Sequence, residues 1–168
     1  MDKSITAELG CVTPTIVVPG PWSKADLKYQ AENIATQKLH NGSFNCIASQ
    51  ILVLPEIWDS VDDLLAVVKS TISTATPRKP YYPGAQDRHE SIKKVYQNCE
   101  DLDDSDSCEL PRILITNLDN DNANEYLFNE EDLLWECQAL RLLKREIKNG
   151  STENNLNWWC NSNRCCNC

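Results

Sequence analysis

The segment Asn41-Gly42-Ser43-Phe44-Asn45-Cys46 joins two patterned stretches of the sequence. Before it, residues 23–40 repeat apolar side chains at the spacing of one helix face, namely Leu27, Ala31, Ile34, Ala35 and Leu39. Gly42 follows where a helix C-cap needs a left-handed residue. After it, residues 50–54 are short, apolar and β-forming, and a proline ends the run, which predicts a buried strand. Cys46 therefore falls on a connection between a helix and a strand.

Three more segments have helical patterns. Residues 60–74 place apolar side chains on one face, and residues 86–96 form a shorter, more polar run. Ser23 and Ser60 each have an aspartate three residues later, the spacing of a capping box. The third segment has helical spacing that ends near Asn149-Gly150, with apolar or thiol side chains at Leu133, Leu134, Cys137, Leu140, Leu143 and Ile147.

Strand patterns alternate with these helices. Residues 14–19 and 112–116 are extended and apolar, in addition to residues 50–54. The alternation predicts an α/β fold, with a layered, mainly parallel sheet and flanking helices. We expect one domain over residues 1–150 and a polar, cysteine-rich tail, expected to be disordered, over residues 151–168.

Cys46 has two readings. A cysteine held on a rigid connection suits a nucleophile, because the thiolate is the reacting species and needs a fixed donor or base nearby. A lone cysteine is more often a small buried hydrophobe. His40 could pair with Cys46, although a cation at a helix C-terminus is the simpler account. His89 lies among charged residues, which predicts a solvated face.

A second segment favours the nucleophile. Glu8-Leu9-Gly10 precedes Pro14-Thr15-Ile16-Val17, and together with residues 41–46 this order resembles the aldehyde dehydrogenase family. In that family a Glu-Leu-Gly motif before a Pro-x-Ile-Val strand holds the general base, and a later turn ends in the nucleophilic cysteine. The resemblance implies that Glu8 is the base and Cys46 the nucleophile.

The resemblance continues along the chain. Residues 78–85 and 110–116 look like a less common branch of the family, and residues 128–133 resemble its Glu-x-Phe segment. Glu131 then takes the position of the glutamate that hydrogen-bonds the nucleotide ribose. The match spans about residues 5–135, in family order.

The resemblance implies oxidation of a small-molecule aldehyde to an acid with NAD or NADP, through a thioester on Cys46. Its nucleotide-binding half would lie upstream of Glu8, where only seven residues stand, so we expect the catalytic half alone, with weak or no nucleotide binding and little activity. A homo-oligomer is a further possibility. The alternative is a non-catalytic remnant that acts as an interaction protein.

Composition limits the partners. The chain has 168 residues, a net charge of −9 and a pI near 4.7, so nucleic acid and anionic membranes would repel it. Residues 100–106 are mostly acidic and predict a solvated loop, since the spacing of a calcium loop is missing.

No run reaches the roughly 20 apolar residues of a membrane span, and no signal-peptide core follows Lys3. We therefore expect a reducing cytoplasm, in which the nine cysteines stay mostly as thiols. Four of them, Cys160, Cys165, Cys166 and Cys168, could bind zinc, but their spacing is cramped and we predict no metal site.

Overall fold

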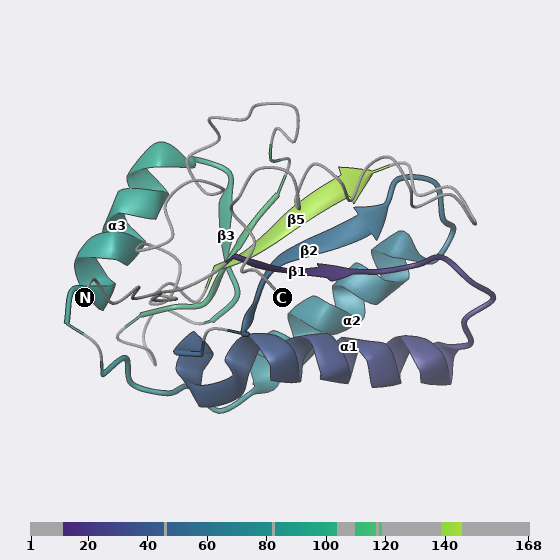
Figure 1. Cartoon of the computed structure of the whole chain (residues 1–168), viewed down its shortest axis with the longest axis horizontal. Coiled ribbons are helices and arrows are strands. Elements are labelled where there is room, and N and C mark those ends of the chain that lie inside the picture. The colour runs from purple at the N-terminus through teal and green to yellow at the C-terminus, as the bar shows by residue number, and fades with distance from the viewer. Residues whose placement is uncertain are drawn as a thin grey trace, which may run out of the picture.

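The computed structural model describes residues 12–45, 47–81, 83–103, 110–116, 118 and, for the backbone alone, 139–145. Figure 1 shows strands and helices that alternate along most of this chain. The elements are β1 (Thr13–Ile16), α1 (Lys24–Leu39), η1 (His40–Ser43), β2 (Ser49–Pro55), α2 (Val61–Thr74), α3 (Ala85–Val95), β3 (Cys99–Asp101), β4 (Ile113–Ile115) and β5 (Ala139–Arg145).

The strands form one sheet in the order β1-β2-β5-β4-β3. β1 is parallel to β2, β2 to β5 and β5 to β4, whereas β3 is antiparallel to β4. Register pairs join Thr15 to Leu52 and Leu52 to Leu142. The predicted layered and mainly parallel sheet is confirmed for the described residues.

One face of the sheet packs against α1 and α2 (Figure 1). Successive strand side chains point to opposite faces, so Leu52 and Leu54 of β2 share this face with Leu114 of β4. The helices contribute Leu27, Ala31, Ile34, Ala35, Val61, Leu64, Val68 and Ile72. All of these side chains are buried, which makes this the larger core.

The opposite face has its own core. Ile51 and Val53 of β2 and Ile113 and Ile115 of β4 pack there with Ile92 of α3. Helices therefore cover both faces, and the fold has three layers, as the alternating pattern predicts. Among the described residues, no helix is both long and apolar enough to cross a membrane.

The ends of α1 agree with the sequence. The Ser23 backbone N–H donates to the Asp26 carboxylate at 2.8 Å, and the Asp26 N–H donates to Ser23 Oγ at 3.2 Å. Hydrogen bonds from Ser23 hold the pKa of Asp26 below its usual value. The same prediction for α2 is wrong in part, because the helix begins at Val61 but the Ser60 side chain forms no capping hydrogen bond.

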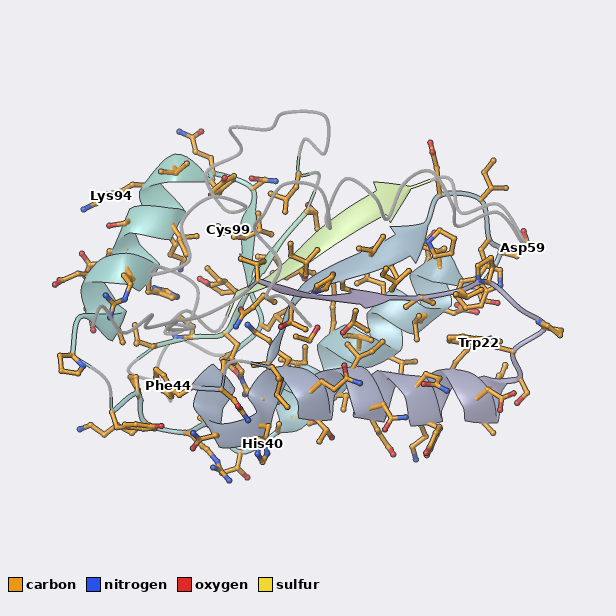
Figure 2. The ribbon with its side chains drawn as sticks, in the orientation of Figure 1. Trp22, His40, Phe44, Asp59, Lys94 and Cys99 are labelled. Carbon is orange, nitrogen blue, oxygen red and sulfur yellow. The ribbon has the colours of Figure 1, made fainter. Side chains whose placement is uncertain are left out.

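The loops at the carboxyl ends of β1 and β2 are tied together. The rings of Trp22 and Trp58 meet edge to face with centroids 4.8 Å apart, and Trp58 Nε1 donates to the Gly20 carbonyl at 3.1 Å. Figure 2 shows Trp22 and Asp59 near this end of the molecule and His40 near the other. His40 lies at the end where β1 and β2 begin.

The main correction concerns residues 133–147, which the apolar spacing predicts as a helix. Residues 139–145 form β5 instead, paired with β2 on one side and β4 on the other. Backbone pairing on both sides outweighs helix propensity, because β2 and β4 would otherwise each leave a row of buried polar groups without partners. The sequence also has Leu140 and Leu142 at strand spacing.

Asp103 departs from the solvated loop predicted at residues 100–106, whereas Glu100 and Asp101 are exposed as expected, and residues 104–106 lie outside the described residues. The Asp103 carboxylate is buried and accepts from Arg112 Nε at 2.7 and 2.9 Å, from Arg112 Nη2, and from the Arg112 backbone N–H at 2.7 Å. Arg112 is only 2% exposed, and its Nη2 also donates to the Ala75 carbonyl at 2.9 Å. Arg112, at the start of β4, is therefore joined to Asp103 by an ion pair and to the end of α2 by the hydrogen bond to Ala75.

We expect Arg112→Met to lower the free energy of unfolding by about 3–5 kcal/mol, because it leaves a buried carboxylate without its cation. Urea unfolding followed by circular dichroism measures the loss. Lys69→Met is the matched control: it breaks the more exposed Lys69–Glu100 pair and costs about 1 kcal/mol or less. Equal losses in the two variants would contradict the assigned role of the buried pair.

His89 also differs from its predicted solvated position. The ring is 5% exposed, and Nε2 lies 3.0 Å from the Pro111 carbonyl oxygen, which accepts its hydrogen. Burial lowers the pKa of His89 below its usual value, and the positive charge of Lys93 acts in the same direction. The hydrogen bond to Pro111, with Asp101 and Glu90, opposes this shift only partly.

A lowered pKa makes stability depend on pH. Below about pH 6.5 the unfolded chain protonates His89 while the folded chain resists, so acidification favours unfolding until the pH falls below the folded pKa. We expect the free energy of unfolding to decrease between pH 7.5 and 5.5, and His89→Gln to have a smaller decrease. His40→Gln, which changes an exposed histidine, should keep the wild-type slope. Identical slopes in all three proteins would refute the assignment.

Candidate functional site

The connection from α1 to β2 is a tight left-handed turn. Asn41, Gly42 and Ser43 have φ values of 52°, 66° and 72°. Side chains other than glycine rarely adopt such values, and asparagine is one of the residues that tolerate them best. The prediction that Asn41-Gly42 ends the helix in a left-handed conformation is confirmed.

Side-chain contacts hold this turn in place. Asn41 Nδ2 donates to the Phe44 carbonyl at 2.9 Å and to the Tyr81 hydroxyl at 3.1 Å. The rings of Phe44 and Tyr81 pack with centroids 4.6 Å apart. Figure 2 shows Phe44 and His40 beside the carboxyl end of α1. The turn is therefore fixed by its own amide and by the segment that links α2 to α3.

Lys38 is a buried cation at the last turn of α1. It is 1% exposed, and its Nζ donates to Gln50 Oε1 of β2 at 2.9 Å. Ser43 Oγ donates to the Lys38 carbonyl at 2.5 Å, so the left-handed turn folds back onto the helix end. Polar groups are buried here at a place where the helix, the turn and the strand meet.

The starts of β1 and β2 are joined by hydroxyl groups. Thr15 Oγ1 lies 2.8 Å from Ser49 Oγ and donates to Gln37 Oε1 at 3.0 Å. Beyond the turn, the Ala48 N–H donates to the Asn45 carbonyl at 2.9 Å. The backbone is thus fixed on both sides of position 46.

Glu8, Cys46 and Glu131 all lie outside the described residues. In the sequence they precede Thr13 of β1, Ser49 of β2 and Ala139 of β5 by five, three and eight positions. Those three strands are neighbours and parallel, so their amino ends lie at one edge of the sheet. The structure thus describes the three strands that follow these residues in the sequence, and not the residues themselves.

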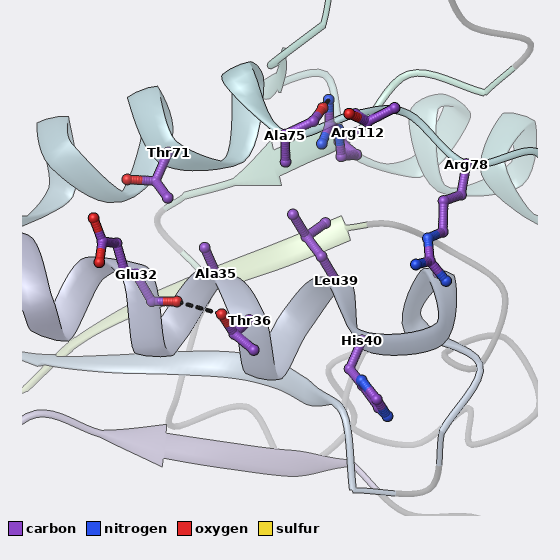
Figure 3. Close-up of a pocket in the computed structure, with 11 residues that line it drawn as sticks. Glu32, Ala35, Thr36, Leu39, His40, Thr71, Ala75, Arg78 and Arg112 are labelled. Carbon is purple, nitrogen blue, oxygen red and sulfur yellow. Dashed lines mark hydrogen bonds between the residues drawn. The ribbon is translucent and has the colours of Figure 1, made fainter.

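A cleft of about 550 Å³ opens between α1 and α2 at their carboxyl ends (Figure 3). Its walls are Glu32, Ala35, Thr36, Leu39, His40, Gly42, Thr71, Ala75, Thr76, Arg78 and Arg112. His40, for which a cation at the helix C-terminus is the simpler account, is exposed and lines this cleft, and the alternative pair with Cys46 involves a residue outside the described ones. Within the described ranges, no three His, Cys, Asp or Glu side chains lie close enough together to hold a metal ion.

The sequence analysis did not predict three residues that shape this end of the molecule, Lys38, Arg112 and Tyr81. Lys38 falls on the apolar face of α1, three residues after Ala35, and that position is the one available signal of its burial. Arg112 stands directly before a β-rich run, with nothing in the pattern to indicate Asp103 as its partner. Tyr81 adjoins prolines, which predicts only an edge of the core.

Solved structures with a similar fold are aldehyde dehydrogenases. Aldehyde dehydrogenase 21 from Physcomitrella patens, solved with the reaction product succinate, matches with a TM-score of 0.58 and 15% identity over 83% of this chain. A putative methylmalonate-semialdehyde dehydrogenase from Sinorhizobium meliloti, solved with NAD, gives 0.63 and 12% over 82%. An NAD-dependent aldehyde dehydrogenase from the same organism gives 0.59 and 18% over 83%.

This chain has the fold of part of an aldehyde dehydrogenase. It spans 30%, 30% and 29% of those three proteins, so it corresponds to less than a third of their length. No model of a known protein family matches the sequence, and no curated protein does. At these identities the likeness shows the aldehyde dehydrogenase fold alone.

Gly42 gives a direct test of the turn in this aldehyde dehydrogenase fold. Its φ is +66°, and an added Cβ would lie 3.3 Å from Phe44 Cδ2. We expect Gly42→Ala to lower the free energy of unfolding by about 1–2 kcal/mol, the cost of a left-handed alanine. Thermal unfolding at pH 7.5 measures it. Gly20→Ala is the comparison: its glycine has no left-handed φ, and its added Cβ would lie 2.9 Å from Trp22 Nε1, so this variant reports steric crowding without backbone strain. A neutral Gly42→Ala would contradict the described turn.

Proposed function

We propose that this chain is the nucleophile-bearing part of an aldehyde dehydrogenase, with Cys46 as the nucleophile and Glu8 as the general base. The observation that supports it most is the order of the strands. Glu8, Cys46 and Glu131 stand before β1, β2 and β5, three adjacent parallel strands, and a base and a nucleophile must meet at one place. The aldehyde dehydrogenase fold of the neighbours supports the same assignment.

The proposed reaction assigns one step to each residue. The Cys46 thiolate forms a bond to the aldehyde carbon, and the carbonyl oxygen becomes an oxyanion that the Cys46 backbone N–H stabilises. When bound, NAD or NADP would supply the hydride acceptor that oxidation of this carbon to the thioester needs, and Glu131 would contact its ribose. Glu8 then removes a proton from water. The water oxygen bonds to the thioester carbon, the carbon–sulfur bond breaks, and the acid leaves Cys46 as a thiolate.

The described turn supports a fixed nucleophile. The Asn41 side chain donates to the Phe44 carbonyl, and the Ala48 N–H donates to the Asn45 carbonyl. Hydrogen bonds therefore order the backbone just before and just after position 46. Ordering of the reacting groups before reaction supplies a large part of an enzyme's rate advantage. The alternative, a remnant that binds a partner without catalysis, is supported by the limited share of the neighbours that the chain spans.

Cysteine labelling separates the two functions. We expect iodoacetamide to modify Cys46 at least several-fold faster than Cys165, Cys166 or Cys168 at pH 6.5, well below the usual thiol pKa of about 8.5, because only a stabilised thiolate reacts there. Site-resolved mass spectrometry measures each rate. Cys99, a half-buried cysteine of β3, is an internal reference.

Two variants complete the experiment. Cys46→Ser identifies the fast signal, and Asn41→Ala should slow the labelling of Cys46 by releasing the turn. If Cys46 reacts no faster than the tail thiols in the folded wild-type chain, the activated nucleophile is wrong and the non-catalytic remnant is the better account.

A further inference from the structure

The cleft between α1 and α2 has chemically different ends. Glu32, Ala35, Thr36 and Leu39 lie at helical spacing along one face of α1 and form one wall. The end of α2 and the segment after it form the other. Figure 3 shows Glu32 near one end of the cleft and His40 with Arg78 near the other. Eight residues of helix separate Glu32 from His40, which is about 12 Å.

Arg112 is a second cation in the lining of this cleft. Its Nε and Nη2 are used by Asp103 and by the Ala75 carbonyl. Its Nη1 donates to no residue in the part of the chain that the structure describes, although the side chain is 98% buried and lines the cleft. A guanidinium offers five N–H donors, so an acceptor in the cleft would take the hydrogen bonds that Nη1 still offers.

Arg78 supplies the net positive charge at this end of the cleft. It is exposed, lines the cleft and forms no ion pair among the described residues. Arg112 is neutralised by Asp103, so the net local charge at this end is close to one positive unit. The carboxyl ends of two helices lie here, and the negative ends of their dipoles oppose the binding of any anion, a doubly charged one more than a singly charged one. A singly charged anion fits this balance.

Apolar side chains fill the rest of the lining. Ala35, Leu39 and Ala75 contribute hydrocarbon surface, and the hydroxyls of Thr36 and Thr71 already donate to backbone carbonyls of their own helices. The volume of about 550 Å³ lies within the range of small-molecule sites. A ligand here would have one anionic group and a short aliphatic chain.

We propose that this cleft binds a short-chain aliphatic carboxylate. The carboxylate accepts hydrogen bonds from the Arg78 guanidinium and from Arg112 Nη1, and the chain lies against Ala35 and Leu39. Arg78, Arg112, Ala35 and Leu39 have no part in the proposed catalytic reaction, so this site goes beyond the proposed function.

Hexanoate is the probe. Titration into the ¹⁵N-labelled full chain at pH 7.5 should give saturable shifts of the amides of Ala35, Leu39 and Ala75. Arg78→Met should weaken binding at least about tenfold, since it removes the charge and keeps a chain of similar length. Lys94→Met is the matched control: it removes an exposed positive charge on α3, outside the cleft, and should bind as the wild type.

Three outcomes would overturn the proposal: no saturable shift, equal affinity for hexanol and hexanoate, or inorganic phosphate binding more tightly than hexanoate. An undiminished affinity in Arg78→Met would do the same. Cys46→Ser should bind hexanoate as the wild type does, so loss of the catalytic assignment and loss of this site are separate results.

Discussion

The fold depends on the pairing of β5 with β2 and β4. Without this strand the described sheet is two pieces, one holding β1 and β2 and the other β3 and β4. β5 pairs in parallel with both neighbours and so satisfies the backbone groups between them. The larger core also spans this strand, because Leu114 of β4 shares a face with Leu52 of β2 across β5.

Local patterns predicted the elements that depend on local interactions. α1 has a capping box and an apolar face within its own sequence, and both are present. The strand conformation of β5 and the burial of His89 and Asp103 depend on partners distant in the sequence. His89 meets Pro111, and β5 needs two strands that the helical spacing of its leucines does not indicate. Helix spacing alone cannot distinguish such a segment from a strand with neighbours on both sides.

The candidate site also has features that follow from local sequence and features that depend on distant partners. Asn41-Gly42 predicted a left-handed turn from residue chemistry, and the turn is there. The buried Lys38–Gln50 contact and the Tyr81 hydroxyl bond arise from packing between elements and have no short-range signal. Glu8 and Cys46 came from a resemblance, and both lie outside the described residues.

The position of β5 also has a consequence for synthesis. β2 leaves the ribosome about ninety residues before β5, and β4 about twenty-five, so both strands exist for a time with an open edge. At roughly 5–20 residues per second that interval lasts several seconds, during which exposed strand edges can pair with other chains. A nascent chain of this kind would be a natural client of chaperones that shield strand edges until the final strand is inserted.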